Sequence, residues 1–248
     1  MYDYNMLTPG PSKVRKNVLE ARAIQAGNSD LDPEFYDFYK RTCAKYSHFL
    51  NTANPSFLLS GEGILGLEAA CASLTEPGDR VLVLDNGIFG RGFADFVRIY
   101  GGEPVLFSTD PTRRSRPRPC ALPQEGRGLP LCHARALRHA LRRAQRHPRP
   151  LPDPEGIRNP HGRGLGVRDV RQPVDARRAK IDILLGGSQK ALSCPTGLTM
   201  VTVSQDAFRR MEARKTPIAS FYANLLALRD YYEKQWFPYT MPACDIHG

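Results

Sequence analysis

The sequence lacks any apolar run long enough to cross a membrane, and its first thirty residues lack the apolar core of a signal peptide. Its six cysteines are widely scattered and form no Cys-x-x-Cys pair, so reduced thiols are expected. These absences favour a cytoplasmic protein with no membrane partner. With 248 residues, 41% of them hydrophobic, the chain can bury the core of one large domain.

Residues 110–179 lack lysine, and no aromatic residue occurs from 108 to 207. The 110–179 window holds 17 of the 35 basic residues, all arginine, but only 6 of the 25 acidic residues, together with 11 of the 21 prolines. The flanks hold 18 basic and 19 acidic residues, so the net charge of +10 originates in this window. A segment so poor in large apolar side chains cannot offset the entropy of ordering itself.

The window could be a basic arm for RNA or DNA, but it offers no aromatic residue on which a base could stack, so nucleic acid is not expected as a partner. Its cysteines and histidines, Cys120, Cys132, His133 and His139, fit no standard zinc spacing, and no metal site is expected. We interpret the window as disordered or as the product of two compensating frameshifts. A GC-rich gene read in the wrong frame yields a sequence that is rich in arginine and proline and lacks lysine and aromatic residues. The DNA around codons 109 and 180 would test this hypothesis.

Outside the window, short apolar runs alternate with helical patterns. Strands are expected at 57–59, 80–84, 104–107, 181–185 and 198–203, and helices at 14–23, 32–50, 64–74, 93–100, 205–214 and from after 222 to about 235. Continuous apolar strands are typical of a parallel sheet that is buried on both faces. The alternation therefore predicts an α/β fold, with a mostly parallel sheet flanked by helices.

Lys190 follows one of these strands, after Gly186-Gly187 and the small polar residues Ser188 and Gln189. The glycines allow a sharp turn and close approach to a ligand, and the serine and glutamine side chains can hold phosphate oxygens. Open α/β sheets bind ligands at the carboxyl ends of their strands. A partly desolvated lysine at that place can act as a nucleophile and form a Schiff base. For a lysine considered alone, an exposed loop position is the alternative.

A second strand–turn–helix unit contains the turn Gly61-Glu62-Gly63, and its helix begins at about Ile64. Free backbone N–H groups and the positive end of the helix dipole suit such a turn to an anion. The turn is therefore a candidate phosphate cradle, with a simple turn as the alternative.

The segment GSQKAL at 187–192, followed by Pro195, Gly197 and Leu198, resembles the cofactor-lysine segment of class V aminotransferases of the alanine–glyoxylate and serine–pyruvate type. Ser-Gly-x-Gly before a helix with Leu-Glu-Ala resembles the phosphate loop of the same family. The resemblance covers 1–109 and 180–248. It implies pyridoxal 5'-phosphate (PLP) as cofactor and the fold type I large domain of PLP-dependent transferases. It also implies an active site shared across a homodimer, and a small carboxy-terminal domain that we expect to be missing here.

The resemblance also implies roles for single residues. Lys190 is the expected catalytic residue, which would bind the cofactor and move the proton. The side chain of Glu62 is unsuited to a phosphate, so its backbone is the expected contact. The expected cofactor-binding residues are Gly61, Glu62, Gly63, Ile64, Phe89, Ser188, Gln189, Lys190 and Thr240, and the expected substrate-binding residues are Pro9 and Gly10. Phe89 would stack on the pyridine ring, and Thr240 would reach the partner's phosphate beside Phe237, where a tyrosine is usual.

The implied reaction moves an amino group from an amino acid of the alanine or serine type to a 2-oxo acid of the glyoxylate or pyruvate type. It needs an acid beside the pyridine nitrogen, and the family places one within the window, where Asp169 and Asp175 lack an apolar strand around them. No arginine can be named for the substrate carboxylate. A non-catalytic remnant and a nucleic-acid-binding protein acting through 110–179 therefore remain alternatives.

Overall fold

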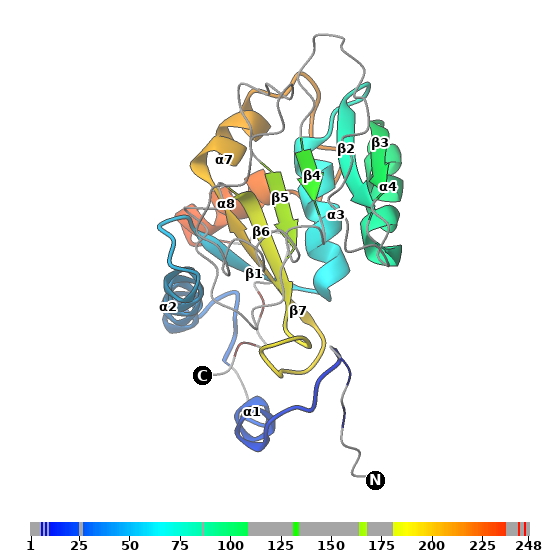
Figure 1. Ribbon diagram of the computed structural model, residues 1–248. Helices are drawn as coiled ribbons and strands as arrows, with labels where there is room; N and C mark the ends of the chain where they lie inside the picture. Colours follow the sequence, from blue (N-terminus) through cyan, green and yellow to red (C-terminus); the bar gives the residue numbers. More distant parts are fainter. Residues whose placement is uncertain are drawn as a thin grey trace.

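A computed structural model describes most of both flanks and two short stretches of the arginine-rich window. The described residues are 6, 8, 10–24, 27–85, 87–108, 131–133, 164–167, 181–236, 243 and 246. They form one central sheet with helices on both of its faces (Figure 1).

The structure confirms the predicted α/β class and the helices and strands expected in the flanks. The helices are α1 (Lys16–Arg22), α2 (Pro33–Phe49), α3 (Gly63–Leu74), α4 (Ile88–Ile99), α7 (Gln205–Glu212) and α8 (Leu225–Lys234). The strands are β1 (Ser56–Ser60), β2 (Arg80–Asp85), β3 (Glu103–Ser108), β4 (Leu131–His133), β5 (Gly164–Val167), β6 (Ile181–Gly187) and β7 (Leu198–Val203).

The sheet has seven strands in the order β1-β7-β6-β5-β4-β2-β3. The five strands β6, β5, β4, β2 and β3, which are neighbours in that order, pair in parallel. Strand β7 runs antiparallel to both β6 and β1. Parallel strands have their carboxyl ends at one edge of the sheet. The ends of β2 and β6 therefore share the edge at which α/β sheets bind ligands.

Two strands of this sheet, β4 and β5, come from the arginine-rich window and lie between β2 and β6 (Figure 1). Leu131 pairs with Leu82, and Leu165 pairs with Ile183. The sequence pattern predicts no strand there, because elements of three and four residues are too short for an alternation of polar and apolar side chains to show. The rest of the window lies outside the described residues, and its interpretation as a frameshift product stays a hypothesis.

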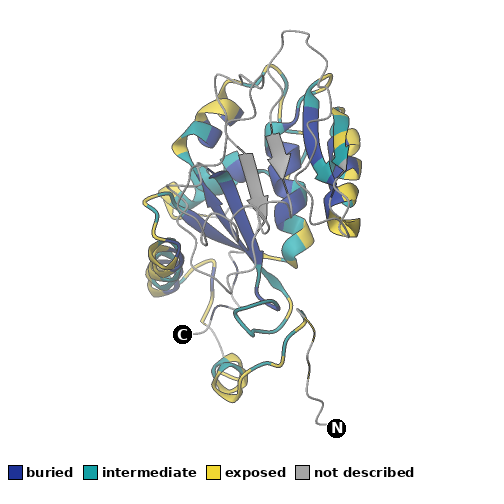
Figure 2. Ribbon diagram, in the orientation of Figure 1, coloured by how far each residue is buried: buried dark blue, intermediate teal, exposed yellow. Residues whose placement is uncertain are grey.

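Two neighbouring residues of β6 show why the sheet has a core on each face. Successive side chains of a strand point to opposite faces. Leu185 joins the cluster that contains buried residues of α3, α4 and α7, whereas Leu184 joins the cluster that contains those of α2. Figure 2 shows the buried residues concentrated in the strands and in the helix faces that meet them. The continuous apolar run thus reflects burial on both faces, as predicted.

Candidate functional site

Lys190 lies just beyond the carboxyl end of β6, after a tight turn. Its backbone N–H donates to the Gly187 carbonyl at 3.1 Å, and the Ser188 N–H donates to the Leu198 carbonyl at 3.0 Å, at the start of β7. Lys190 is partly buried. The turn therefore holds the lysine at the ligand-binding edge of the sheet, which is the position that the sequence predicts.

Ser188 stabilises the loop that follows Lys190. Its side chain is 2% exposed, and its hydroxyl donates to the Pro195 carbonyl at 2.6 Å and accepts from the Leu198 N–H at 3.3 Å. The hydroxyl hydrogen is therefore used inside the loop. This arrangement disfavours the expected role of this side chain as a donor to a phosphate oxygen.

We expect Ser188→Ala to lower the free energy of unfolding by about 1–3 kcal/mol, because the Pro195 carbonyl and the Leu198 N–H would lose their partner. Urea-induced unfolding would measure the change. Thr196 lies exposed in the same loop, and Thr196→Ala should change the value by no more than about 0.5 kcal/mol. Equal effects of the two substitutions would contradict this role of Ser188.

The amino end of α3 abuts the carboxyl end of β6. A Cβ placed on Gly63 would lie 3.6 Å from the Gly187 Cα, which leaves room for little more than backbone between the two elements. The Gly61 N–H donates to the Gly197 carbonyl at 2.7 Å, and the Gly61 carbonyl accepts from the Thr199 hydroxyl at 3.1 Å. The predicted cradle and the lysine loop therefore form one site.

Glu62 and Gln189 connect the two halves of this site. Glu62 is the N-cap of α3, and its Oε1 accepts from the Ile64 N–H at 3.3 Å. The Gln189 Nε2 donates to the Glu62 Oε2 at 3.1 Å. Gln189 is 4% exposed, and its Oε1 is buried without a hydrogen-bond partner in the described part of the chain. The carboxylate itself, and not only the backbone at Glu62, thus occupies the helix end.

Gly10 lies against Lys190, although the two residues are far apart in the sequence. A Cβ on Gly10 would overlap the Lys190 Cδ and would lie 3.1 Å from its Nζ. Ser12 fixes this contact, because its N–H donates to the Gln189 carbonyl at 3.0 Å and its hydroxyl donates to the Lys190 carbonyl at 2.7 Å. Pro9, expected beside Gly10, lies outside the described residues.

Phe89 lies in the first turn of α4, whereas the sequence pattern predicts a loop at Phe89 and a helix that begins at Phe93. Gly87 is the N-cap with a φ of 140°, which a glycine adopts readily, and the chain enters the helix at once. The Phe89 side chain is 54% exposed. Since β2 and β6 end at the same edge, Phe89 and Lys190 share that edge. Thr240 and Phe237 lie outside the described residues.

Two residues absent from the predicted site support it. One is Ser12, and the other is Asp85, the last residue of β2, which is 5% exposed. The Asp85 Oδ2 accepts from Arg91 Nε at 3.0 Å and lies 2.9 Å from Arg91 Nη2, while Oδ1 accepts from the Gly87 N–H at 3.3 Å. A buried carboxylate needs such partners. An aspartate two residues before a glycine is a turn signal that could have indicated it.

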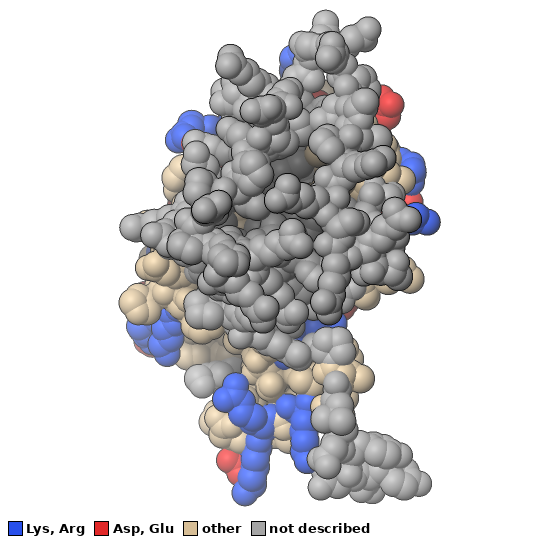
Figure 3. All heavy atoms as spheres, viewed as in Figure 1, with Lys and Arg blue, Asp and Glu red and all other residues tan. Residues whose placement is uncertain are grey.

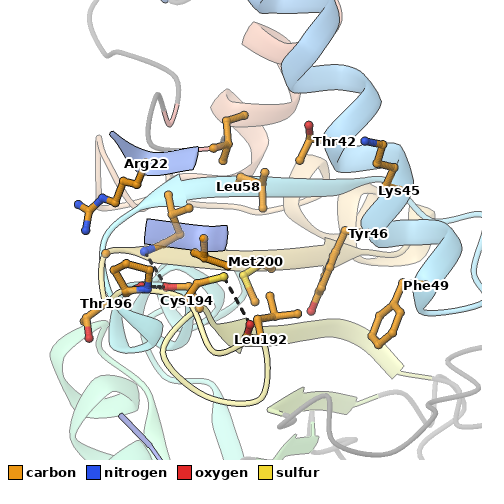
Figure 4. Close-up of a pocket in the computed structure, with 16 residues that line it drawn as sticks. Arg22, Thr42, Lys45, Tyr46, Phe49, Leu58, Leu192, Cys194, Thr196 and Met200 are labelled. Carbon is orange, nitrogen blue, oxygen red and sulfur yellow. Dashed lines mark hydrogen bonds between the residues drawn. The ribbon is translucent and has the colours of Figure 1, made fainter. Parts of the chain in front are cut away.

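A cavity of about 320 Å³ lies beside the lysine loop, between α1, α2 and residues 192–198 (Figure 4). Its walls are largely apolar, and Arg22 and Lys45 also line it. The Tyr46 hydroxyl is buried without a hydrogen-bond partner in the described structure, and burial raises the pKa of Tyr46 well above its usual value. Burial also raises the pKa of the Cys194 thiol, and the positive charge of Arg15 partly offsets this rise. Lys190 does not line this cavity, which is therefore distinct from the edge site.

Within the described ranges, no group of three or more His, Cys, Asp or Glu residues could hold a metal ion. Nor does this part of the chain contain a helix with the length and apolarity that a membrane span requires. Figure 3 shows lysine and arginine side chains gathered at the end of the molecule where α1 lies, and there Lys16 pairs with Glu20 at 3.3 Å.

No protein-family model matches the chain. It is 30% identical to the pyridoxamine–pyruvate transaminase of Mesorhizobium japonicum, over 98% of this chain and 62% of that protein. It is 26% identical to the alanine–glyoxylate aminotransferase of Callithrix jacchus, over 98% of this chain and 60% of that protein. The chain thus spans about three fifths of the length of these curated relatives.

Solved structures show the same fold. An alanine–glyoxylate aminotransferase from Nostoc sp. superposes with a TM-score of 0.78 at 22% identity, over 99% of this chain and 65% of that one. Pyridoxamine–pyruvate aminotransferase from Mesorhizobium loti gives a TM-score of 0.70 at 22% identity, over 98% of this chain and 64% of that one. The chain is therefore a homologue of the class V aminotransferases, with the PLP-dependent transferase fold of type I.

Proposed function

We propose that this chain carries the cofactor lysine of an aminotransferase that moves an amino group between an amino compound and a 2-oxo acid. Its amino donor would be an amino acid of the alanine or serine type, or pyridoxamine, and its acceptor would be glyoxylate or pyruvate. One observation carries the proposal: a partly buried lysine lies at the ligand-binding edge of the sheet, with Gly10 against its side chain. The names of the relatives support the choice of substrates.

The residues at this edge fit the aldehyde and ring of a pyridoxal group. The Lys190 amine can react with an aldehyde, and the exposed Phe89 offers an aromatic face for a pyridine ring. When bound, that ring stores the electron pair released at the substrate α-carbon. The Lys190 Nζ would take the proton from that carbon and deliver it to the carbon that was the aldehyde of the ring compound, and the reverse half-reaction would move it back. Ser12 would keep the amine in place, because it holds the Lys190 carbonyl.

The pyridine-nitrogen acid and the contact across a homodimer concern residues outside the described structure. Asp169 and Asp175 lie in the arginine-rich window, and neither is assigned to the pyridine nitrogen. A homodimer would bring Thr240 of one subunit to the cofactor of the other. The group that binds the substrate carboxylate is not assigned to any residue of this chain.

Absorbance spectroscopy tests the proposal. The protein mixed with pyridoxal or with PLP should show a long-wavelength band from the lysine adduct. Adding alanine or serine should discharge the band, and adding pyruvate or glyoxylate should restore it. A spectrum equal to the sum of protein and free compound, for both pyridoxal and PLP, would contradict the proposal.

We expect Gly10→Ala to weaken this adduct about tenfold or more in apparent dissociation constant. The new methyl group would overlap the Lys190 side chain, and Gly10 has a φ of 155°, which disfavours a side chain. Titration of the absorbance band measures the effect. Gly92 on α4 offers a matched control, because a Cβ there meets nothing within 4 Å and Gly92→Ala should bind normally. Normal binding by Gly10→Ala would show that the segment does not position the lysine.

A further inference from the structure

We propose that the cavity between α1, α2 and residues 192–198 binds a small monocarboxylate that has an apolar body and a hydroxyl group at the end away from the carboxylate. The cavity is separate from the edge site, since Lys190 does not line it. The inference therefore does not depend on the proposed aminotransferase function, and it assigns the chain a second ligand site.

The size and the walls of this cavity fit a small apolar body. Its volume of about 320 Å³ lies within the range of roughly 300–1,000 Å³ that is typical of ligand pockets. Its wall on α2 contains Tyr46 and Phe49, whose rings stack with 6.5 Å between their centroids. Val18 of α1, Leu58 of β1 and Met200 of β7 line it as well. An apolar body that fills this space would leave water on several sides at once.

The Tyr46 hydroxyl is a polar group that an occupant of the cavity would satisfy. Tyr46 is 9% exposed, and its hydroxyl is buried without a hydrogen-bond partner in the described part of the chain. In Figure 4 the side chain extends from α2 toward Leu192, which also lines the cavity. A buried hydroxyl without a partner is unfavourable. Because a tyrosine hydroxyl can both donate and accept, a hydroxyl group on the ligand is complementary to it.

The charges at the open side of the cavity are positive. Arg22 of α1 and Lys45 of α2 line the cavity and are exposed. Arg15 lies close by, because its Nη2 donates to the Leu192 carbonyl at 3.3 Å. No acidic residue is among the described residues that line the cavity. A carboxylate at this opening would lie beside cations while it stays in contact with water, so that its loss of hydration is small.

Titration calorimetry on the full chain tests the site with two compounds. One is para-hydroxyphenylpropionate, which carries a hydroxyl at the end away from its carboxylate, and the other is phenylpropionate, which lacks that hydroxyl. The wild type should bind the hydroxylated compound about fivefold more tightly, as expected for one hydrogen bond. Tyr46→Phe keeps the ring and removes only a hydroxyl that has no partner in the described structure, so it should fold and bind the two compounds equally.

A second pair of variants tests the charge at the opening. Lys45→Met keeps an apolar side chain and removes the charge, so it should weaken the binding of both compounds about threefold. Lys40→Met is the matched control, because Lys40 also lies on α2 but its ammonium group lies over the rings of Tyr36 and Tyr232 and does not line the cavity. This control should bind both compounds as the wild type does.

A wild type that binds neither compound, or binds both equally, would overturn the inference, and so would a preference that persists in Tyr46→Phe. Equal weakening by Lys45→Met and Lys40→Met would overturn the placement of the carboxylate at this opening. If neither compound binds and Val18→Asp abolishes self-association of the chain, the cavity belongs to an interface with a second copy. Each of these results leaves the proposed function intact, because the absorbance band of the lysine adduct is a separate measurement.

Discussion

Lys190→Ala should abolish the long-wavelength absorbance that pyridoxal or PLP produces with the wild type, because it removes the amine that reacts with the aldehyde. Lys190→Arg should abolish it equally, since a guanidinium stays protonated and forms no Schiff base. Neither change should lower the free energy of unfolding by more than about 1 kcal/mol. The lysine is only partly buried, and Ser12 binds its backbone carbonyl rather than its side chain.

Lys45→Ala is the matched control for these variants. Lys45 lines the cavity between α1 and α2, which does not include Lys190. The control should keep the absorbance band of the wild type. A band that persists in Lys190→Arg, or one that Lys45→Ala also removes, would show that another amine binds the aldehyde. In that event the edge of the sheet would not be the reactive site.

Lys190 and the turn before α3 could be predicted from the sequence because their signals are local. An apolar run, a glycine pair and a lysine occur within a few residues, and their relation to the sheet follows from the βαβ pattern. The same reasoning predicted the strands β1, β2, β3, β6 and β7. Each of these predictions depends only on residues that are neighbours along the chain.

The contacts that shape the site could not be predicted in this way, because they join residues from different elements. Gln189 binds Glu62 only after β6 and α3 have packed together, and Gly10 meets Lys190 only after the amino-terminal segment has docked on the lysine loop. The start of α4 at Ile88 depends on the conformation of Gly87, which the sequence does not reveal. The strands β4 and β5 are recognisable only by their pairing with β2 and β6, because their own residues carry no strand pattern.

Phe57→Ala should cause the largest loss of stability among the substitutions considered, about 3–5 kcal/mol in the free energy of unfolding. Phe57 is fully buried on β1. Its ring makes edge contacts with Phe208 of α7, at 6.2 Å between centroids, and with Tyr232 of α8, at 5.3 Å. Removing it leaves a cavity where two helices meet the sheet. Denaturant-induced unfolding followed by circular dichroism would measure the loss.

The matched control for this substitution is Phe221→Ala, which removes the same side chain at a position that is 59% exposed. It should change the free energy of unfolding by less than about 1 kcal/mol. The ring of Phe57 contacts α7 and α8, whereas Lys190 lies against Gly10 and is held by Ser12. Phe57→Ala should therefore weaken the pyridoxal adduct only at temperatures where the fold is lost. Loss of the adduct by a fully folded Phe57→Ala variant would contradict this separation of core and site.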